Sequence, residues 1–523
     1  TLQQAALAPE QFVALDAVKA MTVKLRPDGP LPVAIANFRL ATLDPAGTEQ
    51  QTFMACTLLH EQWGLSTPTY RSRSVTFSFD PQFYFCNHGD PLPEGFDFDP
   101  GDGQGFRRVS PGDQLCVTYS SEGCVNATLR CGALESGFSL QLDAQPAPPP
   151  ADELWQLQAV NGCRGTAYVY RAHGQSRLTR PMIVAEGFPG GYPCDYLYEM
   201  LNQHDTLEAL RKAGYDLILL SFANGMDLLQ NNAQVMQACI GRVMQRTAEP
   251  LVVSGVSMGG LVARYALAAM ETCGQAHNTR LFLTIDTPHR GAYTNLCNQW
   301  FAQYFANASP MAGGFSALLN SPANQQFVMS WFNGQSVQVS PLREQFIQAL
   351  AANGNYPQQP RRLAIACGAG DGQRCLSSHQ LALDWSGSPL AGARLWTLAE
   401  TGDACAVIAE GYSALADGSI ADSLSDNSEL SWEGAPGGQN LYNVYSASIA
   451  QAIGYGEVSA PIGKTCAVPT VSALDLPGSP FEAIPAPERG LSPFDDYICC
   501  ETNQLHLQFT PKIKDWLLDQ LTR

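Results

Sequence analysis

Hydrophobic and polar positions follow two different patterns along this chain, and the change falls near residue 148. Before it, short runs alternate apolar and polar residues, and clusters of Gly, Pro and Asp separate them, as at 99–103. Alternation with a period of two is typical of strands that bury one face. The runs that predict strands are 31–40, 74–79, 114–120 and 137–142. We therefore predict a smaller all-β, sandwich-like domain over residues 1–148.

A proline-rich segment at 145–150 ends this first pattern. Proline has no backbone N–H, so the segment cannot continue a helix or a central strand. Beyond it, apolar runs alternate with helical ones, which predicts strands buried on both faces with helices between them. The predicted strands are 168–170, 181–186, 216–222, 251–255 and 281–285, and the predicted helices are 206–213, 231–245, 258–272 and 511–521. The fold class predicted for 149–523 is α/β, with a doubly wound, mostly parallel sheet.

The segment 251–261 contains the clearest chemical signal in the chain. It runs from an apolar strand through the turn Gly255-Val256-Ser257-Met258-Gly259 into a helix. In this context a G-x-S-x-G turn presents a serine nucleophile at the end of a sheet strand. The glycines let strand and helix approach closely, and the helix N-terminus favours developing negative charge. Ser257 is therefore predicted to be a catalytic nucleophile.

A serine that attacks a carbonyl needs two backbone amides to hold the oxyanion. The first is the amide of Met258, which follows the serine. The second is expected after the strand 181–185, where the sequence is Glu186-Gly187-Phe188-Pro189-Gly190-Gly191. Gly187 lets the backbone turn there, and Pro189 has no N–H to donate. We predict the amide of Phe188 as the second donor; the alternative is an ordinary glycine turn.

Four histidines follow Ser257, and the base of such a site follows its nucleophile along the chain. His506 is the predicted base, because it lies just before the last predicted helix, where the loop after the final strand returns to the serine. His277 lies in a polar connection after the serine's helix. His289 closes the next strand and is predicted to be structural. His379 comes too soon after the expected acid loop to return over the site.

Three aspartates compete for the role of the acid that orients the imidazole. The segment 361–372 is an apolar strand that runs into a glycine turn and Asp371. Asp371 would lie at the carboxyl end of the penultimate strand, and we predict it as the acid. Asp475 and Asp495 stay open as alternatives.

Together these motifs resemble those of the α/β-hydrolase lipases and esterases. Residues 255–265, with the sequence GVSMGGLVARY, are similar to that superfamily's GHSMGGLVARY turn. Residues 286–292 resemble its TPHxG strand end, and Glu186-Gly187-Phe188 occupies the place of its histidine–glycine–hydrophobic sequence. The resemblance covers 180–295 closely and 360–523 loosely, and it leaves 1–150 outside. It implies an α/β-hydrolase fold with a Ser-His-Asp triad.

Two positions depart from the family pattern. Glu186 replaces the usual histidine, which leaves the amide of Phe188 usable. Val468-Pro469 resembles the family's DGxVP acid loop, but Thr465 stands where that loop has its aspartate. Because of the second departure, the family pattern does not identify the acid of this chain.

An insertion at 294–358 is rich in Asn, Gln, Ala, Phe and Met, with an aromatic run at 327–332. Lipase-like enzymes have a helical cap over the acyl pocket at this point, so the resemblance implies a cap here. The alternative is a set of core helices that pack against the sheet edge, because aromatic runs usually mark a core.

Composition narrows the possible partners and the cellular compartment. The formal net charge of −18 over 523 residues disfavours nucleic acids and anionic lipid, and only 15% of residues are charged. Sixteen cysteines, scattered without the paired spacing of zinc ligands, favour disulfides and a secreted or periplasmic location. The alternative is a set of buried free thiols in a cytosolic enzyme. No stretch reaches the length of a membrane helix, and the first residues lack a signal peptide, which we expect to have been removed.

The function predicted from these observations is hydrolysis of carboxylic esters through Ser257, His506 and Asp371. The expected substrate is an ester or a lipid-like molecule, and the reaction needs no cofactor and no metal. The alternatives within the same chemistry are a polyester depolymerase and an acyltransferase. An alternative of another class is a non-catalytic binding protein on a hydrolase scaffold. The sequence does not indicate an oligomeric state.

Overall fold

The computed structural model divides into two compact units, Thr1–Ala147 and Pro148–Arg523. It describes residues 30–41, 49–57, 69–70, 72–86, 91–142, 148–388, 390–400, 406–414, 422–428, 431–453, 456–487 and 491–522. The first residues of the chain and residues 145–147 of the proline-rich segment lie outside the described part.

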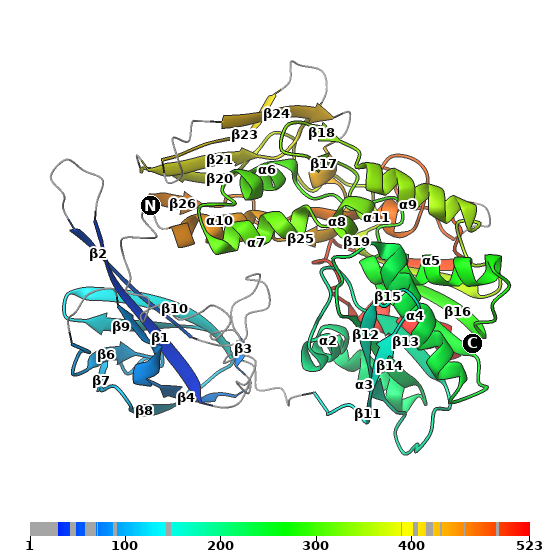
Figure 1. Cartoon of the computed structure of the whole chain (residues 1–523), viewed down its shortest axis with the longest axis horizontal. Helices are drawn as coiled ribbons and strands as arrows, with labels where there is room; N and C mark the ends of the chain where they lie inside the picture. Colours follow the sequence, from blue (N-terminus) through cyan, green and yellow to red (C-terminus); the bar gives the residue numbers. More distant parts are fainter. Residues whose placement is uncertain are drawn as a thin grey trace. The chain divides into compact units, whose positions relative to one another are not determined.

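In its described part, the first unit consists mainly of strands in two sheets (Figure 1). One sheet has the order β2 (Glu49–Thr57), β1 (Leu31–Ala41), β4 (Ser74–Ser78) and β8 (Gln114–Thr118), and β5 (Tyr84–Cys86) also pairs with β1. The other has the order β3 (Thr69–Tyr70), β10 (Leu134–Leu142), β9 (Gly123–Cys131), β6 (Phe96–Asp99) and β7 (Arg107–Val109). Phe77 and Val117 of the first sheet share one hydrophobic core with Phe98 and Leu140 of the second.

An eight-stranded sheet forms the centre of the second unit (Figure 1). Its order is β11 (Glu153–Gln158), β12 (Arg164–Tyr170), β14 (Asp216–Phe222), β13 (Pro181–Ala185), β15 (Leu251–Val256), β16 (Thr279–Ile285), β19 (Arg361–Ala369) and β28 (Asp496–Cys500). Every neighbouring pair from β14 to β28 is parallel. All residues of β13, β14 and β15 are buried, which accounts for their continuous apolar sequence. The mostly parallel sheet predicted from the sequence is therefore present.

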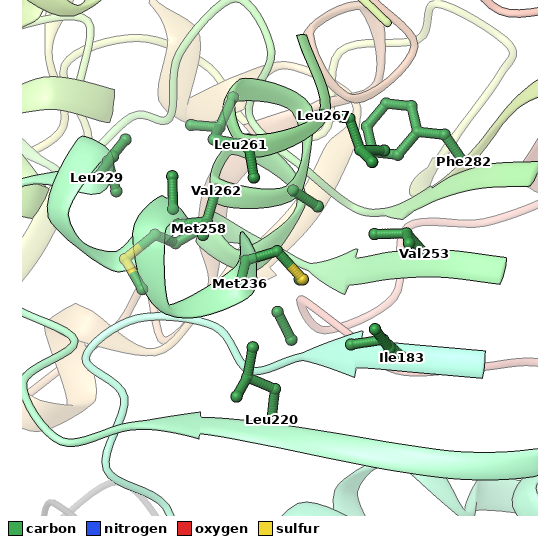
Figure 2. Close-up of a cluster of buried hydrophobic side chains, with 14 of the residues drawn as sticks. Ile183, Leu220, Leu229, Met236, Val253, Met258, Leu261, Val262, Leu267 and Phe282 are labelled. Atoms are coloured by element: carbon green, nitrogen blue, oxygen red, sulfur yellow. The ribbon is translucent and has the colours of Figure 1, made fainter. Parts of the chain in front are cut away.

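Helices cover both faces of this sheet. On one face lie α4 (Leu229–Met244) and α5 (Met258–Thr272), and on the other lie α2 (Cys194–Leu201), α3 (Thr206–Lys212) and α12 (Pro511–Thr522). Successive residues of β13 point to opposite faces, so Ile183 joins the core with α4 and α5, whereas Val184 joins the core with α2, α3 and α12. Figure 2 shows the first of these cores, with Met258 and Leu261 of α5 packed beside the sheet.

Two insertions interrupt the strand–helix alternation. The first, between β16 and β19, contains α6 (Leu296–Tyr304), α7 (Pro310–Leu319), α8 (Pro322–Phe327), β17 (Trp331–Phe332), β18 (Val337–Gln338) and α9 (Pro341–Ala352). The second, between β19 and β28, contains a six-stranded sheet of order β22 (Ala399–Glu400), β24 (Asp422–Ser428), β23 (Ala406–Ser413), β21 (Ala391–Trp396), β20 (Leu381–Ser386) and β26 (Glu457–Ser459). It also contains β25 (Gly437–Asn440), α10 (Tyr442–Ile453), β27 (Thr465–Pro469) and α11 (Thr470–Ala473). This second sheet was not predicted from the sequence.

The helices of the first insertion divide between two cores. Trp300 of α6 and Phe315 of α7 pack with Trp385 of β20 in a core that belongs to the insertions. In contrast, Phe327 of α8 and Phe346 of α9 pack against the core of the central sheet. The second pair therefore matches the alternative of core helices that pack against the sheet. A cap over the acyl pocket stays a prediction.

The expected disulfides are not present among the described cysteines from Cys116 onward, which are free thiols. Cys124 and Cys131 lie at opposite ends of strand β9, about 23 Å apart at the usual rise per residue. Cys499 and Cys500 are consecutive on β28, so their side chains point to opposite faces. The extracytoplasmic location inferred from the cysteine count stays a prediction. None of the described helices is both long and apolar enough to span a bilayer.

Candidate active site

Ser257 occupies the turn between β15 and α5. Its backbone has φ 52° and ψ −125°, a strained conformation for a residue with a side chain. The turn is possible because its glycines let main chains touch. A Cβ on Gly255 would stand 2.1 Å from the carbonyl carbon of Gly259, and one on Gly259 would stand 2.3 Å from the carbonyl oxygen of Glu186. The predicted strand–turn–helix around Ser257 is therefore present.

His506 lies between β28 and α12, and its imidazole meets the serine. The Nε2 atom of His506 is 2.7 Å from Oγ of Ser257. The imidazole retains 24% of its exposure, so solvent and a substrate can reach it. The structure thus brings together the predicted nucleophile and the predicted base, which are 249 residues apart in the chain.

The carboxylate that meets the imidazole belongs to Asp286. Its Oδ2 atom is 2.7 Å from Nδ1 of His506, and its Oδ1 atom accepts a hydrogen bond from the amide of Cys367 at 2.9 Å. Asp286 directly follows β16, the strand beside the serine's strand, and its side chain is fully buried. The amide of Ser257 donates to the carbonyl of Ile285, so the residue before Asp286 is tied directly to the serine turn.

The prediction that Asp371 is the acid is therefore wrong. Asp371 lies beyond the end of β19 on an exposed turn, where its carboxylate accepts a hydrogen bond from the amide of Gln373. The two alternatives are also engaged elsewhere. Asp475 accepts a hydrogen bond from the hydroxyl of Tyr356, and Asp495 accepts one from the amide of Arg362.

A signal for Asp286 was present in the sequence. It is the first residue after the apolar strand 281–285, and that strand follows the serine's helix, so its carboxyl end lies next to the nucleophile. The segment 286–292 resembles TPHxG and contains His289, but the acid was predicted to follow a later strand. An aspartate directly after the neighbouring buried strand was the stronger candidate on geometry alone.

The other histidines after the serine make contacts away from it. His289 meets Oγ1 of Thr284 and the guanidinium of Arg264, in agreement with the structural role predicted for it. Desolvation lowers the pKa of His289 well below its usual range, and the nearby Arg264 acts in the same direction. His277 meets Glu271, and His379 meets the carbonyl of Val407.

The loop that contains Phe188 lies against the serine. A Cβ on Gly187 would stand 3.1 Å from Cβ of Ser257, so a side chain there would require its neighbours to shift by a few tenths of an ångström. The ring of Phe188 packs edge-on against Phe327 at 5.2 Å, and its carbonyl accepts a hydrogen bond from the hydroxyl of Tyr192. Among the described residues, neither the Phe188 amide nor the Met258 amide donates a backbone hydrogen bond. The assignment of these two amides as oxyanion donors stays a prediction.

Glu186 anchors this loop from inside the protein. Its buried carboxylate accepts hydrogen bonds from the amides of Gly191 at 2.7 Å, Tyr192 at 3.0 Å and Phe222. Burial raises the pKa of Glu186 to about 7, although these backbone donors favour the charged form. The residue that replaces the family histidine therefore orders the loop next to Ser257.

No group of three or more His, Cys, Asp or Glu side chains in the described part of the chain is arranged to hold a metal ion. The reactive geometry that the structure shows is the hydrogen-bonded chain Asp286–His506–Ser257.

No protein-family model and no curated protein matches the chain. Similar solved structures include Est1E from Butyrivibrio proteoclasticus, at 14% identity over 26% of this chain and 51% of that one, with a TM-score of 0.22. The mature Bacillus licheniformis lipase BlEst2 matches at 16% identity over 39% of this chain and 72% of that one, with a TM-score of 0.26. Brefeldin A esterase, a bacterial homologue of human hormone-sensitive lipase, matches at 15% identity over 42% and 70%, with a TM-score of 0.25. The chain spans about half the length of Est1E.

The second unit itself has the features of an α/β-hydrolase fold. Its serine lies on a sharp strand-to-helix turn at the carboxyl end of a mostly parallel sheet, and serine, aspartate and histidine follow in that chain order. The sequence resemblance stated above is confirmed at the level of the fold.

Proposed function

We propose that this protein hydrolyses carboxylic esters as a serine esterase or lipase. The observation that supports the proposal is the continuous hydrogen-bonded chain from Asp286 through His506 to Ser257, on a strand-to-helix turn. Nucleophile and base lie within hydrogen-bond reach, and a third group orients the base, which is the arrangement that activates a serine hydroxyl.

In the proposed reaction, Nε2 of His506 accepts the proton of the Ser257 hydroxyl as its oxygen attacks the ester carbonyl. Asp286 accepts the hydrogen bond of Nδ1–H, which selects the tautomer with a free Nε2 lone pair. The imidazolium that forms is stabilised by the Asp286 carboxylate and then gives its proton to the departing alcohol. Water, activated by the same imidazole, attacks the acyl-enzyme, and release of the acid restores Ser257.

The oxyanion of the tetrahedral intermediate is assigned to the amides of Met258 and Phe188. Met258 is the first residue of α5, so its N–H has no partner within the helix and adds to the positive end of the helix dipole. Phe188 lies on the loop that Gly187 brings against the serine. Donors that are fixed before the reaction stabilise the developing charge without reorganisation.

Hydrolysis of p-nitrophenyl esters by the purified protein tests this proposal. The Ser257→Ala variant, with its folding checked by thermal unfolding, should lose at least about 10³-fold in kcat, as removal of a triad member does. Ser254, which lies three residues earlier within β15, offers a matched control, because Ser254→Ala removes a buried hydroxyl outside the triad. Retention of full activity in Ser257→Ala would refute the assignment of the nucleophile.

A further inference from the structure

Strand β25 of the second insertion lies directly against the Asp286–His506 pair. Gly437 and Gly438 are buried, and the strand pairs with β27 on one side. On its other side it meets the loop that carries His506, where Gln439 and Leu505 form a parallel bridge. An element that is about 150 residues distant from Asp286 in sequence therefore contacts the acid and the loop that carries the base.

Gly438 contacts the carboxylate itself. A Cβ added to Gly438 would stand 2.0 Å from Oδ2 of Asp286, the oxygen that is 2.7 Å from Nδ1 of His506. Contacts this short do not occur, so an alanine here would displace either the carboxylate or the strand. Gly438 has no positive φ, so the absence of a side chain is required by this contact and not by the backbone conformation.

The backbone of β25 holds the histidine loop from the same side. The amide of Gln439 donates to the carbonyl of Gln504 at 2.9 Å, and the amide of His506 donates to the carbonyl of Gln439 at 2.8 Å. Asn503 adds a third connection, because its Oδ1 accepts from the amides of Gly437 at 2.9 Å and Ala369 at 2.8 Å. The His506 loop is thus fixed to β25 and to the end of β19 at once.

We propose that β25 is a positioning element of the active site, which sets the Asp286–His506 hydrogen bond and shields it from water. The inference rests on the proposed function, because its role is defined by the catalytic pair. The fully buried carboxylate is desolvated partly by Gly438, and a hydrogen bond to a charged group strengthens when water is excluded. The second insertion therefore contributes a structural part of the catalytic centre.

Gly438→Ala tests the proposal by steady-state kinetics on a p-nitrophenyl ester. A misplacement of about 1 Å at a catalytic group can cost about 10²-fold in rate, so kcat should fall about 100-fold with little change in KM. The matched control is Gly463→Ala in the same insertion, whose added Cβ meets only Cγ2 of Val444 at 3.5 Å, an ordinary contact. The control should stay within twofold of the wild type.

A double-mutant cycle with Asp286→Ala separates displacement of the carboxylate from general damage. Asp286→Ala removes the oxygen that the new methyl group would meet, so Gly438→Ala should cost less than threefold in that background. An equal loss in both backgrounds would overturn the proposal, and so would wild-type kcat in Gly438→Ala. Loss of the proposed function would appear separately, as a wild-type protein without Ser257-dependent turnover.

Asn503 provides a second route if Gly438→Ala does not fold. Asn503→Ala removes the acceptor of two backbone amides, and kcat should fall at least tenfold while KM stays near its original value. Asn503→Asp keeps an oxygen that can accept from both amides, so it should recover most of that loss. An Asn503→Ala variant with unchanged kcat would contradict the role of this connection.

Discussion

Replacement of Asp286 by asparagine gives the sharpest expectation about the site. The substitution keeps the volume of a fully buried side chain and removes its charge. An amide can present its NH2 group to His506, which favours the tautomer in which Nε2 is protonated and cannot accept the serine proton. The amide of Cys367 keeps an acceptor if the asparagine oxygen takes the place of Oδ1. The variant should therefore fold but lose most of its catalytic activity.

The expected loss can be given a size. In a serine protease, the equivalent change in the triad acid lowers kcat about 10⁴-fold with the geometry intact, which corresponds to about 5.5 kcal/mol of transition-state stabilisation. We expect a loss of about 10³- to 10⁴-fold in kcat for Asp286→Asn. Asp371→Asn, on an exposed turn, should stay within twofold of the wild type.

The assay is steady-state hydrolysis of a short-chain p-nitrophenyl ester across pH 5–9, with thermal unfolding of each variant as the control for folding. Two results would refute the reasoning. One is an Asp286→Asn variant within tenfold of the wild type, and the other is an equal loss in Asp371→Asn. The second result would restore the acid first predicted from the sequence.

Three further variants test other parts of the structure. Burial raises the pKa of Glu433 from 4.5 to about 8, so its contribution to stability is complete below pH 4.5 and is lost as the pH rises through 8. Glu433→Gln should remove this dependence, on the order of 4 kcal/mol between pH 5 and 8.5, in free energies of unfolding measured by urea denaturation. A Glu433→Gln variant with the wild-type slope would contradict this. In Glu186→Gln, the side-chain amide cannot accept all three backbone hydrogen bonds. The variant should therefore lose about 1–3 kcal/mol of stability and about tenfold in kcat/KM. Full activity would show that this anchor is dispensable. A chain of residues 148–523 should retain p-nitrophenyl ester hydrolysis within threefold, because the described triad and its cores lie in that unit; a misfolded product would disprove this independence.

The central strands and the nucleophile could be predicted because their signals are local. Residues 251–256 form a fully buried strand and residues 258–272 form a helix, with the glycine-flanked Ser257 between them. Each of these three features has a direct physical cause. His506 could also be predicted, because chain order and the position of the last helix restrict where a base can return to the serine.

The acid and the second insertion could not be predicted as well, because they depend on long-range packing. Asp286 and Asp371 both follow apolar strands. The sequence signal for Asp286, its place directly after the strand that follows the serine's helix, becomes decisive only with the order of strands in the sheet. The contact of Gly438 with Asp286 depends on how a distant strand folds back, and two adjacent glycines in a sequence usually indicate a turn. The cysteines were misjudged because a count does not say which strand face each thiol occupies.

Covalent labelling of Ser257 is the most direct test of the central claim. The wild-type protein should react with a fluorophosphonate to give one adduct per chain, located on the peptide that contains Ser257, and ester hydrolysis should decline in proportion. Ser257→Ala should give neither adduct nor turnover. A folded wild-type protein that gives no adduct, or one labelled elsewhere while Ser257→Ala still hydrolyses esters, would contradict the account.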